Sequence, residues 1–129
     1  MKDFAYTVTS AKTVDDAVRA VEQATAAHGF RVLHTHDIAG TLAEKGFARE
    51  PLKLVEICNA KAAHEVLEKE IAAVLMLPCP IAIYAQGGQT SISTMLPTRI
   101  GEFFPGRDLE TIAAQVEKAV LAIVEESAR

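Results

Sequence analysis

The chain has 129 residues, of which 50% are hydrophobic and 23% are charged, and this length predicts one domain over residues 1–129. Thirteen Lys and Arg residues face 17 Asp and Glu residues, so the formal net charge is −4, and only 5% of residues are aromatic. This balance argues against nucleic acid as a partner. The apolar run from Ala72 to Ala85 is too short to span a bilayer, and no long apolar stretch follows Lys2. We therefore expect a soluble cytoplasmic protein without a membrane partner.

The first predicted elements are a strand and a helix. The alternation of Phe4–Val8 is typical of a half-buried strand. Thr13, with Asp16 three residues later, is a good helix N-cap, and Gly29 suits the left-handed position that ends a helix. Between them an apolar stripe recurs every three or four residues, as expected of a helix packed on a sheet.

A second strand is predicted over Phe30–Ile38. Strict alternation places His34 and His36 on one face together with Phe30, Val32 and Ile38. A short helix is expected over Thr41–Gly46, with a capping box from Thr41 to Glu44.

The third strand is predicted over Leu52–Cys58, and apolar residues on both of its faces indicate an interior position. Asn59 is expected to cap a helix over Ala60–Leu75. Its predicted buried stripe consists of Ala63, Val66, Leu67, Ile71 and Val74. On its exposed side we expect ion pairs between Lys61 and Glu65 and between Glu65 and Lys69.

The last part of the chain predicts a hairpin and a helix. Gly87 and Gly88 separate the strand patterns Ile81–Ala85 and Thr90–Met95, as in a tight two-residue turn. A loop over Pro97–Arg107 follows, and its Phe103 and Phe104 are expected to be tucked into the core, with a lid or a subunit contact as the alternatives. Asp108 is expected to cap the final helix.

The order of these elements predicts an α+β fold. It reads β-α-β-(short α)-β-α-β-β-α and corresponds to a curved, mainly antiparallel sheet of about five strands with helices on one face. The other face must then be solvated, filled by a ligand or covered by a second subunit.

Two cysteines are the main candidates for chemistry. Cys58 ends the third strand and Cys79 precedes the fourth, so antiparallel neighbours would bring both thiols to one edge of the sheet. The helix start at Asn59 would lower a thiol pKa there and favour the thiolate. The alternative is that both are small buried side chains, as free cysteines usually are.

His34 and His36 are the candidates for metal binding. Residues two apart on one strand face can direct two imidazoles to one ion, and Cys58, Cys79 and Glu56 could complete a site for zinc, copper or haem iron. The alternative is that each histidine is hydrogen-bonded to a neighbouring polar group.

Three motifs resemble the domain of unknown function family numbered 302: Glu56-Ile57-Cys58-Asn59, Leu77-Pro78-Cys79-Pro80 and Ser91–Pro97. The chain departs from the family pattern at Ala60, where the family often has Pro, and at Pro80, where it often has Asn. The resemblance implies a fold similar to the TATA-binding-protein-like α+β class and a small protein that is often a homodimer. It does not imply DNA binding.

Two functional hypotheses follow, and neither decides whether the protein is an enzyme. In the first, Cys58 and Cys79 form a thiol-based module that handles a soft ligand, a metal or a redox partner. In the alternative, a non-catalytic binding module holds an apolar small molecule on the sheet face formed by Tyr6, Val32, His34, His36 and Tyr84. A structural or regulatory dimer without a small ligand is a third possibility.

Overall fold

The computed structural model describes residues 3–129. Five strands form one sheet in the order β1-β5-β4-β3-β2, and every neighbouring pair is antiparallel. The strands are β1 (Ala5–Ser10), β2 (Arg31–Asp37), β3 (Leu52–Cys58), β4 (Cys79–Gln86) and β5 (Gln89–Met95). The helices are α1 (Val14–Ala27), α2 (Ile38–Ala43), α3 (Ala60–Lys69) and α4 (Glu110–Ala128), with the 3₁₀ helices η1 (Ile71–Met76) and η2 (Pro97–Phe103). The predicted α+β class is confirmed.

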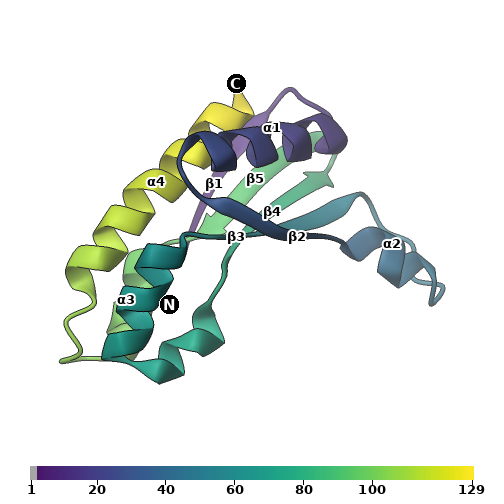
Figure 1. Ribbon diagram of the computed structural model, residues 1–129. Helices are drawn as coiled ribbons and strands as arrows, with labels where there is room; N and C mark the ends of the chain where they lie inside the picture. Colours follow the sequence, from purple (N-terminus) through teal and green to yellow (C-terminus); the bar gives the residue numbers. More distant parts are fainter. Residues whose placement is uncertain (1–2) are drawn as a thin grey trace.

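Helices α1 and α4 cover one face of the sheet (Figure 1). The core lies between them and the central strands, where Val55, Ile57, Ile81, Ile83 and Ile92 are fully buried. No helix of residues 3–129 covers the opposite face, which is called the outer face below (Figure 1). Helix α2 lies beyond the end of β2, away from the core (Figure 1).

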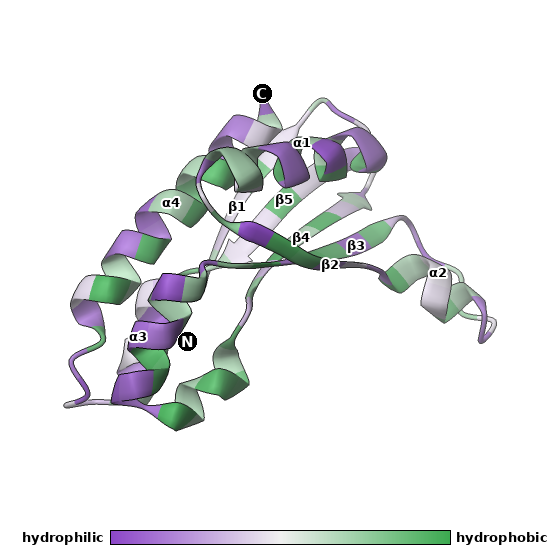
Figure 2. Cartoon of the chain, viewed as in Figure 1, coloured by the Kyte–Doolittle hydropathy of each residue, from purple (hydrophilic) through white to green (hydrophobic). Residues whose placement is uncertain are grey.

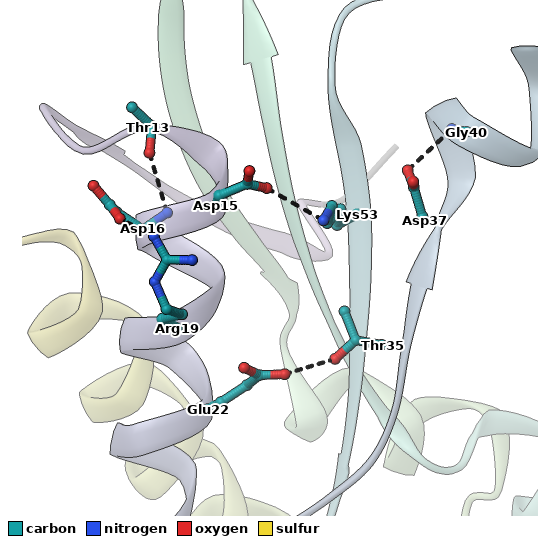
Figure 3. Close-up of polar contacts among 9 residues, drawn as sticks. All are labelled: Thr13, Asp15, Asp16, Arg19, Glu22, Thr35, Asp37, Gly40 and Lys53. Carbon is teal, nitrogen blue, oxygen red and sulfur yellow. Dashed lines mark hydrogen bonds and ion pairs between the residues drawn. The ribbon is translucent and has the colours of Figure 1, made fainter.

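Helix α1 begins and ends as the sequence predicts. The Thr13 hydroxyl accepts a hydrogen bond from the Asp16 amide, and Gly29 follows the helix with a positive φ of 76°. Two polar contacts tie α1 to the sheet: Thr35 donates to Glu22 at 3.0 Å, and Lys53 pairs with Asp15 at 3.2 Å (Figure 3).

The two histidines lie on the other face of β2 from the one predicted. Leu33 is an extra residue in β2, because Val32 lies opposite Ile57 whereas His34 lies opposite Glu56. This β-bulge shifts the alternation by one residue, and a shift of one residue exchanges the two faces of a strand. Both histidines therefore point away from the core-facing Phe30 and Val32 and are exposed.

The short helix was predicted too late in the sequence. Helix α2 begins at Ile38, and its N-cap is Asp37, whose carboxylate accepts a hydrogen bond from the Gly40 amide at 3.0 Å (Figure 3). The predicted capping box from Thr41 to Glu44 is therefore wrong. Asp is at least as good an N-cap as Thr, so the helix can begin directly after Asp37, four residues earlier than Thr41.

The helix after Asn59 is shorter than predicted. It ends at Lys69, and the extended Glu70 (φ −156°, ψ 103°) separates it from η1. The carboxylate of Glu70 caps η1 by accepting from the Ala72 amide. The break turns the apolar residues outward, so Ile71 is 69% exposed and Val74 47%, contrary to the predicted buried stripe. Figure 2 shows this hydrophobic segment at the margin of the molecule, below α3.

The hairpin was predicted correctly. Gly87 and Gly88 form its two-residue turn with φ values of 60° and 78°, a conformation that glycine adopts without strain.

The approach to the last helix differs from the prediction. The loop after Pro97 contains η2, and Phe103 is 66% exposed, so it is not tucked into the core. Asp108 does not cap α4, because Leu109 occupies the N-cap position without a side-chain bond. The Asp108 carboxylate instead pairs with Lys69 at 3.2 Å.

Candidate functional site

A small apolar cavity lies where β3 and β4 meet α3, α4 and η2. Its volume is about 50 Å³. Its walls are mostly aliphatic side chains, and both cysteines of the chain line it. We call it the thiol cavity. Characteristic wall residues are Ile57, Cys58, Ala63, Val66, Cys79 and Ala113.

The strand register brings the two cysteines together. Cys79 lies opposite Ile57 on the neighbouring antiparallel strand, so Cys58 is the next residue along β3. Asn59 then starts α3 directly, because its side-chain oxygen accepts a hydrogen bond from the Ala62 amide at 3.0 Å. The prediction that both thiols reach one end of the sheet is therefore correct.

The electrostatics of the thiols are opposite to the expectation. Burial raises the pKa of the Cys79 thiol to about 11, and the nearby Cys58 adds to this rise. Burial also raises the pKa of Cys58. Loss of water disfavours the thiolate more than the start of α3 favours it. Both thiols are therefore protonated at neutral pH, and a protonated thiol is a poor nucleophile.

The two histidines lie close together on the outer face. Their ring centroids are 4.4 Å apart in an edge-on arrangement, and His36 Nε2 lies 2.6 Å from a carboxylate oxygen of Glu56. Within residues 3–129, no group of three or more His, Cys, Asp or Glu side chains is arranged to hold a metal ion. The metal set of Cys58, Cys79, His34 and His36 is therefore not assembled there.

The predicted sheet-face site divides between the two faces. Tyr6 and Val32 pack against the core, and the Tyr6 hydroxyl donates to Glu125 of α4 at 2.7 Å. Tyr84 lies opposite Leu52 and Ser91, in the same alternation as the exposed histidines. These five residues cannot contact one ligand on a single face.

A second hollow adjoins the thiol cavity between α3 and α4. We call it the α3–α4 groove; its volume is about 260 Å³. Four residues line both hollows: Phe30, Asn59, Ala62 and Val116. The groove also has polar residues, among them Lys61, Glu65 and Gln115. Nothing in the sequence predicts this groove, because α3 and α4 are distant in the chain and the alanines that line it resemble ordinary helix formers.

The fold and this site define a class of α+β protein with an open antiparallel sheet and a small apolar cavity at one end of it. The family described as "Domain of unknown function DUF302" matches residues 6–127, and the chain belongs to that family. The crystal structure of an uncharacterized conserved DUF302 protein from Bacillus stearothermophilus is similar, with a TM-score of 0.92 and 29% sequence identity. The similarity covers 99% of this chain and 100% of that one.

No curated protein matches the chain. In the part of the chain that the structure describes, none of the helices has the length and apolar character needed to cross a membrane.

Proposed function

We propose that the protein is a binding module that takes a small, apolar, soft molecule into the thiol cavity. The observation that carries this proposal is the composition of the cavity: aliphatic side chains and two thiols whose raised pKa keeps them neutral. A neutral thiol behaves as a small polarisable hydrophobe, so it favours apolar and sulfur-containing groups rather than ions.

The size of the cavity limits the ligand. One water-sized sphere occupies about 10–15 Å³ of such volume, so about three to five non-hydrogen atoms fit into the thiol cavity. Burial of a methylene group contributes about 0.8 kcal/mol, or about 3 kcal/mol for four of them. Binding of the apolar part alone should therefore be weak, with a Kd of about 1 mM or above.

The test is a titration of ¹⁵N-labelled protein with 3-methylbutan-1-ol, followed by NMR. We expect saturable shifts of amide signals next to the cavity, such as those of Asn59 and Ala113. Ala63 lines the cavity but not the groove, so Ala63→Leu should fill the space and abolish the shifts, whereas Ala114→Leu on the exposed side of α4 should not. If Ala63→Leu does not fold, Ala63→Val provides the smaller filling. Absence of any saturable shift in the wild-type protein would exclude the proposal.

A second use of the same site is thiol–disulfide exchange, and its support is that both cysteines line the cavity and that Cys58 follows the residue paired with Cys79. Oxidised glutathione would accept two electrons and two protons as the two thiols close a disulfide. Mass spectrometry would then find the loss of two hydrogens, and Cys58→Ser would prevent it. Recovery of both free thiols after such treatment excludes this use. The homodimer implied by the family resemblance stays a prediction.

A further inference from the structure

We propose that the α3–α4 groove holds the polar part of the same ligand, and that this ligand is a small zwitterion with a short aliphatic or thioether side chain. This is the chemistry of an apolar α-amino acid. The inference rests on the proposed function, because it places the side chain of that ligand in the thiol cavity.

The first argument is the position of the groove. Four residues line both hollows, so the two hollows adjoin at these residues. Another surface hollow, of about 480 Å³ and lined by Phe4, Met95 and Phe103 among others, shares only Ile100 with the cavity. The α3–α4 groove is therefore the hollow that adjoins the cavity most closely, and we place in it the ligand atoms that the cavity does not hold.

The second argument is the charge that lines the groove. Lys61 and Glu65 lie one helical turn apart on α3, and both line it. The sequence predicted an ion pair between them, yet within residues 3–129 neither side chain makes an ion pair or a side-chain hydrogen bond. A Lys that precedes a Glu by four residues is the less favourable order for such a pair.

The histidine of the groove already has a partner. His28 Nε2 lies 2.5 Å from a carboxylate oxygen of Glu126, so this histidine is engaged. One ammonium and one carboxylate are left facing the groove. A ligand that carries one group of each sign complements both side chains. An anion alone would pair with Lys61 and be repelled by Glu65, and a cation alone would do the reverse.

The third argument is size. The cavity takes about three to five non-hydrogen atoms, a range that includes the isobutyl group of leucine and the thioether chain of methionine. A zwitterionic group next to such a side chain would lie in the groove while the apolar part stays in the thiol cavity.

The experiment compares four probes that share one branched hydrocarbon chain: leucine, 4-methylpentanoate, 3-methylbutylamine and 3-methylbutan-1-ol. Their Kd values are measured by the same NMR titration. An exposed ion pair is worth about 0.2–1 kcal/mol, so each charge should improve binding by up to about fivefold. We expect leucine to bind about tenfold more tightly than the alcohol, with the two singly charged probes between them.

Variants assign the effect to the groove. Lys61→Gln and Glu65→Gln should each weaken leucine binding by about two- to fivefold and leave binding of the alcohol unchanged. Lys118→Gln is the matched control, because Lys118 is exposed on α4 and does not line the groove.

The outcomes separate this inference from the proposed function. If the alcohol binds and leucine binds no more tightly, the groove is not a zwitterion site, although the cavity is still a binding site. If leucine binds better but the two α3 variants have no effect, the inference is also overturned. If none of the four probes binds, both proposals fail.

Discussion

Deprotonation of the Cys79 thiol is expected to destabilise the fold at alkaline pH. Burial, with a smaller contribution from Cys58, raises the pKa of this thiol from 9.0 to about 11. The unfolded chain releases the proton at the ordinary value, so between pH 9 and pH 11 the folded state binds it more tightly. The resulting stabilisation is complete below pH 9 and is lost as the pH rises through 11. At 1.36 kcal/mol per pH unit, the loss is about 3 kcal/mol.

The assay is urea denaturation of the wild-type protein and of Cys79→Ala over this pH range. The variant lacks the titrating group, so the difference in unfolding free energy between the two proteins should shrink by about 3 kcal/mol from pH 9 to pH 11. Other titrations act on both proteins and cancel. Parallel pH profiles would refute the reasoning, because they would mean that the folded Cys79 ionises as freely as the unfolded one.

The reactivity of the same thiol gives an independent check. A pKa two units above the ordinary value leaves about 100-fold less thiolate at neutral pH, so iodoacetamide should alkylate Cys79 at least that much more slowly than a solvated thiol. Cys58→Ser should lower the pKa of Cys79 and speed its alkylation, because Cys58 contributes to the rise.

Two predictions concern the fold and are measured by urea denaturation near neutral pH. Ile83→Ala should lower the unfolding free energy by about 2–5 kcal/mol, because the side chain is fully buried in the central strand β4; a loss below 1 kcal/mol would mean that the core refills the space. Gly88→Ala should cost about 1–2 kcal/mol, because the hairpin needs a φ of 78° there; an unchanged stability would mean that the turn adopts another type.

Much of the fold was predictable because several residues fix local geometry without help from the rest of the chain. Thr13 and Gly29 mark the start and the end of α1. Gly87 and Gly88 adopt the positive φ values that a tight hairpin turn requires. The strand Leu52–Cys58 was predicted with its observed limits, because an apolar run between Pro51 and the helix cap Asn59 has few alternatives.

The error after Lys69 has a physical cause that a helical pattern cannot reveal. Apolar residues continue through Val74 with helical spacing, so periodicity extends the helix. In the structure, the Glu70 carboxylate caps η1 and also pairs with Arg107 at 3.1 Å. Arg107 belongs to the distant segment before α4. This long-range contact favours the end of the helix at Lys69, which the local sequence does not encode.

The site was predictable only as far as the strand order was. Antiparallel neighbours brought Cys58 and Cys79 to one end of the sheet, as expected. The pKa values of both thiols are raised rather than lowered as expected, because packing against the cavity walls removes part of their contact with water. A helix start lowers the pKa of a thiol and apolar burial raises it, and which effect dominates depends on packing between segments far apart in the chain.

The histidines show how one residue changes a functional prediction. Counting by twos along β2 assigns His34 and His36 to the core face, and the bulge at Leu33 reverses that assignment. Val32 and His34 pair with the adjacent residues Ile57 and Glu56 of β3, and adjacent residues of a strand face opposite sides of the sheet. Leu33 therefore lets the strand continue its pairing while the apolar Val32 stays in the core and the polar His34 meets Glu56. The face of the two histidines was predicted wrongly because strict alternation was assumed through Leu33. Their polarity alone would have placed them on the outer face, beside Glu56.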